Sequence, residues 1–242
     1  MFGTACWPSP IATWFEPRDG VVFRINDSGV AVGATGTCTG LTFSYVNALR
    51  ATLWQTDLGN LGGTLAPPQG FGNFAYDVNT WGHVVGTSGT SDGSQHAFFW
   101  SPETLIQDVG TVPGDVASVG LSISDLGDIG GISFPADPNA SPRAFIRPDG
   151  GTVTDLNALI PPNSPLYLFA ACSINPEGEI IGMALDAQGN FHGYLATPRN
   201  GAPGAAQQST VSPSPQFEHV WSVARSRLGM FRGLQKPARL NP

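Results

Sequence analysis

Histidine, lysine, serine and the acidic residues are the side chains of this sequence that could perform catalysis or hold a metal. The histidines are His83, His96, His192 and His219, and none lies in an H-E-x-x-H sequence or beside a cysteine pair at zinc spacing. Lys236 is the only lysine, which excludes lysine-based covalent catalysis in the rest of the chain. The sequence therefore predicts no catalytic residue, no cofactor and no metal ligand, and favours a protein that is not an enzyme.

Two of the histidines belong instead to a polar position that recurs along the chain. This position opens a short apolar segment four times, as Arg50, His96, Arg143 and His192, at spacings of 46, 47 and 49 residues. An aspartate follows it in the first three copies, as Asp57, Asp108 and Asp155. A repeated polar residue at the start of a strand ordinarily anchors a turn or an aspartate, and such an aspartate caps the next turn through backbone N–H groups. We therefore interpret both series as structural repeat positions.

A four-residue turn precedes each of these polar positions. Asparagine or serine opens the turn, as Asn26, Asn79, Ser124 and Asn175, and glycine closes it, as Gly29, Gly82, Gly127 and Gly178. A short polar side chain suits the first position of a type I turn, and glycine tolerates the positive φ that follows. A type I turn with a left-handed glycine is a three-residue hairpin loop with a bulge. We therefore expect positive φ at all four glycines, between antiparallel strands.

The markers keep the same order in every copy, and the turns recur at spacings of 53, 45 and 51 residues. No helical period interrupts them, and each copy has room for about four short strands. Large side chains of the apolar segments, such as Trp54, Phe98 and Phe145, are expected in the core between sheets. The sequence thus predicts an all-β fold, a small β-propeller or an open propeller-like array of about four or five antiparallel sheets.

Composition and charge divide the chain into three parts. Residues 1–20 look like part of an earlier repeat, residues 21–198 hold the four repeats, and residues 199–242 form a Pro-rich linker with a basic end. Residues 1–198 contain five arginines against seventeen acidic residues, a net charge of −12, and residues 199–242 carry +5. The acidic body argues against nucleic-acid binding. For the basic tail, contact with a membrane surface or with the acidic body and a frayed, unattached end both stay open.

The motifs of the second repeat resemble a known family. His96-Ala97-Phe98, the preceding N-x-x-G-x-V-V-G hairpin and the D-L-G-N-L-G-G segment that starts at Asp57 are similar to the HAF repeat, named for its His-Ala-Phe core. The resemblance covers roughly residues 21–198, and the third and fourth copies depart from it, for example with Arg143 in place of the histidine. It implies an extracellular, bacterial, propeller-like protein and no established reaction, so no catalytic residue carries over.

These observations favour a non-enzymatic extracellular scaffold that presents its loops to a protein or glycan ligand. A glycan-active hydrolase, which would need paired carboxylates, and a purely structural surface protein are the alternatives. Because the fourth copy lacks its aspartate and closing strand, we expect residues 1–20 to pair with the sheet of residues 168–197 and to close a ring. Whether Cys6 and Cys38 form a disulfide stays open, since sequence does not give their geometry.

Overall fold

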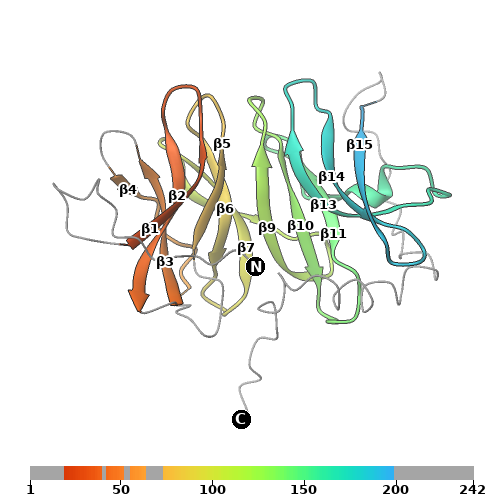
Figure 1. Cartoon of the computed structure of the whole chain (residues 1–242), viewed down its shortest axis with the longest axis horizontal. Helices are drawn as coiled ribbons and strands as arrows, with labels where there is room; N and C mark the ends of the chain where they lie inside the picture. The colour runs from red at the N-terminus through yellow and green to blue at the C-terminus, as the bar shows by residue number, and fades with distance from the viewer. Residues whose placement is uncertain (1–18, 40–41, 52–54, 64–72, 199–242) are drawn as a thin grey trace, which may run out of the picture.

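The computed structural model describes residues 19–39, 42–51, 55–63 and 73–198, and strands make up almost all of its regular structure (Figure 1). Within these ranges there are fifteen β-strands, one short 3-10 turn and no α-helix. No helix that could span a membrane occurs among the described residues. The predicted all-β fold class is therefore confirmed.

The strands follow one another in four groups, which correspond to the four sequence repeats. The first group consists of β1 (Asp19–Ile25), β2 (Ala31–Thr39), β3 (Thr42–Ala51) and β4 (Gln55–Asp57). The second consists of β5 (Phe74–Val78), β6 (Val84–Gly89), β7 (Gln95–Ser101) and β8 (Leu105–Gly110). The third consists of β9 (Asp115–Ile123), β10 (Ile129–Pro135), β11 (Arg143–Arg147) and β12 (Thr154–Asp155), with the 3-10 turn Leu156–Ala158 after it. The fourth has three strands, β13 (Tyr167–Ile174), β14 (Ile180–Leu185) and β15 (Phe191–Ala196).

Hydrogen bonds join these groups into three sheets in the described part of the chain, and none of the sheets closes. β1–β4 form one sheet, β13–β15 form another, and the second and third groups share a sheet of eight strands, so the predicted number of sheets is wrong. One parallel bridge, Gln95 with Ala117, joins the two groups of the large sheet. The Ser118 hydroxyl draws them together there, because it accepts the Ala97 N–H at 2.8 Å and donates to the Gly110 carbonyl oxygen at 2.6 Å.

The hairpin turns form as their polar and glycine residues predict. In all four turns the N–H of the closing glycine donates to the carbonyl oxygen of the opening residue at 3.0 Å. The φ angles of Gly29, Gly82, Gly127 and Gly178 are 76°, 78°, 91° and 78°. This is the left-handed region that a type I turn with a bulge requires, so the hairpin assignment is confirmed.

A second glycine in each repeat admits a bulge in the first strand of that repeat. In the second repeat, Gly86 of β6 pairs with Ala75, and the register of β5 shifts between Ala75 and Asp77. A Cβ atom at Gly86 would lie 1.8 Å from the Phe74 carbonyl oxygen and 2.7 Å from the Phe98 ring. A Cβ atom at Gly33, Gly131 or Gly182 would likewise lie too close to a carbonyl oxygen of the first strand. The glycine therefore lets the bulged strand and an aromatic ring approach one another within each sheet.

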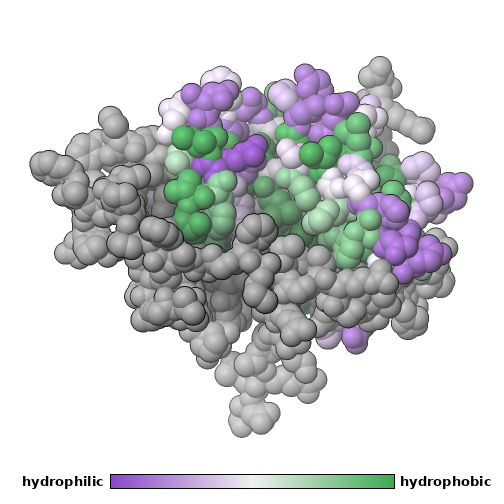
Figure 2. Space-filling model, in the orientation of Figure 1, coloured by the Kyte–Doolittle hydropathy of each residue, from purple (hydrophilic) through white to green (hydrophobic). Residues whose placement is uncertain are grey.

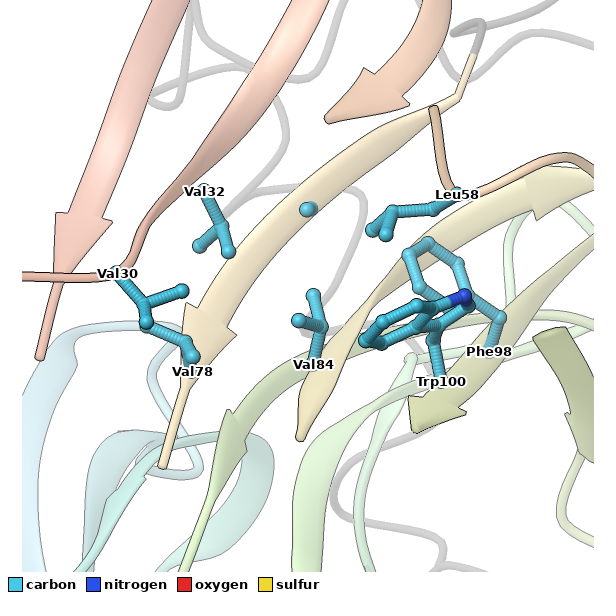
Figure 3. Close-up of a cluster of buried hydrophobic side chains, with 8 residues drawn as sticks. Val30, Val32, Leu58, Val78, Val84, Phe98 and Trp100 are labelled. Atoms are coloured by element: carbon cyan, nitrogen blue, oxygen red, sulfur yellow. The ribbon is translucent and has the colours of Figure 1, made fainter. Parts of the chain in front are cut away.

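Hydrophobic clusters fill the spaces between successive groups of strands. Val32 of the first group packs with Val78 and Phe98 of the second, as Figure 3 shows. A second cluster joins Val85 to Phe145 of the third group, and a third cluster joins the third group to the fourth. Phe98 and Phe145 are fully buried, which confirms the core position expected for them. Each group thus packs one face on the next group. Contacts between side chains, rather than hydrogen bonds between strands, therefore join most successive groups.

The third strand of the first repeat lies in a register that differs from the predicted one. β3 pairs Asn47 with Thr35, whereas the corresponding pair of the second repeat is His96 with Ser88. Asn47 rather than Arg50 therefore occupies the polar repeat position, and the prediction for Arg50 is wrong. The segment N-A-L-R-A-T-L-W offers an alanine at two places three residues apart. β3 takes the register in which Leu49 pairs with Gly33, the bulge glycine of β2, so Ala48 and not Ala51 is the equivalent alanine.

Several sequence predictions lie outside the described residues. These are the position of Trp54, the pairing of Cys6 with Cys38, the contacts of residues 199–242 and the closure of a ring by residues 1–18. Residues 19 and 20, the last two of the predicted closing segment, pair with β2 and not with the last sheet. Between the described parts of the first and last sheets no strand pairing occurs, so these residues form an open series.

Candidate functional site

The hairpin turns of the four repeats lie along one edge of the molecule, the upper edge in Figure 1, which we call the turn edge. Asparagine side chains link the first three turns: Asn26 Nδ2 donates to the Asn79 carbonyl oxygen at 2.8 Å, and Asn79 Nδ2 donates to the Ser124 carbonyl oxygen at 3.1 Å. Asn79 Oδ1 also accepts the backbone N–H groups of Trp81 and His83 at 3.1 and 3.0 Å. One side chain therefore shapes its own turn and fixes it to the next one.

An open hollow of about 370 Å³ lies on this edge, between the second and third turns. The β5–β6 turn, β7, the β7–β8 loop, the β9–β10 turn and the loop after β11 contribute to its wall. The lining residues are Trp81, His83, Phe99, Glu103, Asp125, Leu126, Gly127 and Asp149. Hydrophilic residues dominate the turn edge in Figure 2, and hydrophobic residues appear between and below them. The hollow thus combines aromatic and apolar surface with carboxylates, and its described lining residues include neither lysine nor arginine.

Trp81 is the most exposed aromatic side chain of this lining and is held in place by the neighbouring turn. Its side chain is 70% exposed, yet its indole Nε1 donates to the Asp125 carbonyl oxygen at 3.0 Å. The Thr80 N–H donates to Asp125 Oδ1 at 2.9 Å, which adds a second bond between the same two turns. The indole is therefore an oriented apolar surface that a ligand could cover.

Two half-buried rings lie beside it. The centroids of His83 and Phe99 are 5.5 Å apart, and the rings meet edge to face at 74°. Such a contact stabilises both rings in one orientation. His83 is therefore positioned by an aromatic neighbour within the hollow.

Carboxylates give the hollow a negative charge. Glu103, Asp125 and Asp149 all line it. A hydrogen bond with the Ser101 side chain lowers the pKa of Glu103 below its ordinary value, so this carboxyl is ionised at neutral pH. Because no lysine or arginine is among the described residues of the lining, the hollow favours neutral or cationic ligands over anionic ones.

The polar repeat positions bind aspartates, as the anchoring interpretation predicts. His96 Nδ1 lies 2.8 Å from Asp108 Oδ2 on the closing strand of its own repeat. The fourth repeat has no closing strand in the described residues, and there His192 Nε2 lies 2.9 Å from Asp186 Oδ2 in a hairpin turn. The closing-strand aspartates also cap their own turns: Asp57, Asp108 and Asp155 accept backbone N–H bonds from Gly59, Gly110 and Asn157 at 2.9, 2.7 and 2.8 Å.

Arg143 forms the most enclosed of these anchors. Its guanidinium lies 2.8 Å from Asp115 Oδ1 and 3.7 Å from Asp155 Oδ2, and the Asp115 side chain has no exposed surface. Burial is the largest effect on both carboxyls and raises their pKa values, against the opposing effect of the Arg143 charge. A hydrolase would need its carboxylate pair open to substrate. This pair is enclosed with an arginine, so we interpret it as a buried ionic anchor.

The described residues hold no group of three or more histidine, cysteine or acidic side chains that could bind a metal ion. No protein-family model matches the sequence, and no curated protein matches it either. The resemblance to the HAF repeat therefore stays a prediction that the motifs alone support.

The motifs do not reveal the hollow, because its wall comes from two repeats. The signal that could have indicated it is the third position of each turn. This position holds Ser28, Trp81, Leu126 and Glu177 in the four copies. Turns favour small or polar residues, so a tryptophan and a leucine at successive copies of an exposed position indicate a surface that binds something.

Proposed function

We propose that this protein is a non-enzymatic, extracellular repeat scaffold that binds a saccharide without acidic groups at its turn edge. The observation that carries the proposal is the hollow at Trp81, where an exposed indole lies among carboxylates, with no lysine or arginine among the described lining residues. The extracellular location and the absence of a reaction rest on the resemblance to the HAF repeat.

The chemistry of the lining suits a sugar. A pyranose ring presents a face of C–H groups that packs on an indole, and its hydroxyls donate to carboxylates such as Glu103 and Asp149. The bond from Trp81 Nε1 to the next turn, 3.0 Å long, already orders the side chain, so binding costs less conformational entropy. An amino group on the sugar adds cation–π and ionic attraction, whereas a uronic acid would be repelled.

The architecture that presents this site is, in our proposal, an open arc of a β-propeller. Four meanders in the same strand order, with hydrophobic clusters between successive faces, support it. In propellers and other repeat folds, loops on one edge commonly form the binding surface. The row of turns along the upper edge in Figure 1 would serve that purpose here.

A glycan array combined with a hydrolysis assay tests the function. We expect the protein to retain chitosan oligosaccharides most strongly, cellulose oligosaccharides less and oligogalacturonate not at all, and to release no products from any of them. Retention of the acidic probe alone would contradict the ligand class. Release of shorter products would show that the protein is an enzyme.

Trp81→Ala is the variant that separates site binding from unspecific retention. It should weaken binding at least about tenfold, a loss of about 1.4 kcal/mol, because stacking is lost. Glu177→Ala is the matched control, since Glu177 is exposed at the same position of the fourth turn and lies outside the hollow. Equal effects of the two substitutions would place the ligand elsewhere.

A further inference from the structure

Equivalent positions form the packing between successive repeats, and they define two faces on each group of strands. The forward face packs on the next repeat. It includes Val32 in β2 and Val85 in β6, both fully buried in the clusters they share with that repeat. In β10 the same position is Gly130, where a Cβ atom would lie 3.2 Å from the Ala171 Cβ of the fourth repeat.

The backward face packs on the preceding repeat and lies on the first strand of each group. Ala75 and Val78 of β5 are 0% and 6% exposed in the cluster with the first repeat. Ala171 and Ile174 of β13 hold the same register positions, and they are 0% and 7% exposed in the cluster with the third repeat. In the remaining interface Ile123 of β9 holds the register position of Val78 and is 5% exposed in the cluster with Val85. Three successive interfaces therefore share one arrangement of forward and backward faces.

The two ends of the series expose the same positions. In the last sheet, Ile181 holds the position of Val85, and Leu195 pairs with it as Phe99 pairs with Val85. Ile181 and Leu195 are 53% and 62% exposed. Figure 1 shows this sheet at one end of the molecule and β1–β4 at the other.

In the first sheet, Val22 and Ile25 hold the positions of Ala75 and Val78. They are 59% and 64% exposed, although their counterparts are buried. The molecule thus carries an uncovered forward face, Ile181 with Leu195, and an uncovered backward face, Val22 with Ile25.

The hydrogen bonds between turns show the same pattern. Asn26 and Asn79 donate their amides to the next turn at 2.8 and 3.1 Å. The last asparagine of the series, Asn175, donates instead to Glu179 Oε2 of its own turn at 2.8 Å. At the forward end, Asn175 thus has no following repeat among the described residues to receive its amide, whereas the equivalent amides of the first two repeats each bond to the next turn.

We propose that two copies of this chain associate head to tail, with the forward face of one copy packed on the backward face of the other. The partner is a second copy of the chain, because each of the three buried forward faces in this molecule packs on a backward face. The uncovered forward face has the same positions, so it fits the uncovered backward face of another copy. Such a contact is heterologous, so it joins copies into a closed ring or a filament. This proposal concerns assembly and goes beyond saccharide binding.

Light scattering after size exclusion, over a concentration series of the 242-residue chain, tests the association. We expect a mass of two or more chains at high concentration that falls toward one chain on dilution. Ile25→Asp and Ile181→Asp should each weaken association at least about tenfold, because a charge would enter an apolar contact. Leu126→Asp is the matched control: Leu126 is 66% exposed and lies on the turn edge, outside both faces. Circular dichroism checks that all three variants fold.

Mixing the two interface variants tests the polarity of the contact. Ile25→Asp keeps an intact forward face and Ile181→Asp keeps an intact backward face, so the mixture should form a heterodimer although neither variant associates alone. A wild-type chain that stays monomeric at every concentration would overturn the proposal, for instance if residues 1–18 of the same chain fill these faces. Association that survives both substitutions, or a mixture that stays monomeric, would also overturn it.

Discussion

At the residue scale, glycine serves two separate purposes in each repeat. At Gly29 the φ angle is 76° and a Cβ atom would meet nothing within 4 Å, so only the backbone conformation requires glycine. At Gly86 a Cβ atom would lie 1.8 Å from the Phe74 carbonyl oxygen, so space itself requires glycine. Two alanine substitutions can separate these causes.

Gly29→Ala should destabilise the protein by about 1–2 kcal/mol, the cost of a side chain in the left-handed region. Gly86→Ala should cost more than about 4 kcal/mol or prevent folding, because β5 and the Phe98 ring would have to move. Urea denaturation gives both free energies of unfolding. Equal costs at the two positions would show that β5 can move to make room for a Cβ atom at Gly86. That result would contradict the requirement for glycine there.

Asp186 gives the last hairpin a dependence on pH. Hydrogen bonds with the His192 side chain and with Asn190 hold the pKa of this carboxyl well below its ordinary value. A depressed pKa in the folded state means that the ionised form stabilises the fold. The contribution is present above the unfolded pKa of about 3.9 and is lost as pH falls through the folded pKa.

Asp186→Asn should therefore lower the melting temperature at pH 7, and the difference from the unsubstituted protein should shrink as pH falls below about 4. Thermal unfolding followed by circular dichroism between neutral and acidic pH measures this. A difference of constant size across the whole range would contradict a role for the charge.

At the scale of elements, the turns are coupled to one another as well as formed locally. Asn79 shapes its own turn and donates to the third turn, whereas the bonds of Asn175 to other described residues stay within its own turn. Asp77 adds a second link, because it contacts Arg24 of the first repeat and accepts the Ile123 N–H of the third at 3.0 Å. Neighbouring repeats should therefore stabilise each other through the turn edge.

Asn79→Ala should cost about 1 kcal/mol more than Asn175→Ala, the usual net worth of one additional hydrogen bond. The comparison uses free energies of unfolding in urea, with both substitutions made singly. If the two costs are the same, the bond from Asn79 to the next turn stabilises the fold no more than the bond from Asn175 to Glu179 within its own turn.

The sequence predicts those elements whose cause is local. Asn26 and Gly29 specify their turn through side-chain and φ preferences that act within four residues. The register of β3 was beyond such reasoning, because Ala48 and Ala51 offer alternative matches and only pairing with Gly33 of β2 selects between them. Sequence reasoning also could not predict that two repeats share one sheet. That arrangement depends on a contact between repeats, in which the Ser118 hydroxyl of the third repeat accepts the Ala97 N–H of the second.

The hollow lies at the limit of this kind of prediction. Trp81 and Leu126 are 45 residues apart in sequence and meet only because successive turns lie side by side. The polar repeat positions were easier to interpret, since His96 with Asp108 and Arg143 with Asp155 recur at the same spacing. The repeated motifs indicate structure, and the proposed binding surface lies where single copies depart from the repeat.

At the scale of the whole molecule, the described residues form a linear series of packed sheets with one continuous turn edge (Figure 1). Each group of strands contacts its neighbours through its two faces, which leaves the turn edge free to vary from copy to copy. In this account the faces serve folding and association, and the edge serves recognition. The indole at Trp81 is the residue on which recognition depends most.

The indole N–H signal of Trp81 in a two-dimensional NMR spectrum tests that claim most directly. The chain has six tryptophans, and the Trp81→Ala spectrum identifies the signal by its loss. We predict that a chitosan oligosaccharide shifts this signal and the backbone signals of Thr80 and Leu126, while the N–H signals of Arg143 stay unchanged. Saturable shifts elsewhere with no change at Trp81, or no shift with any of the array probes, would contradict the account.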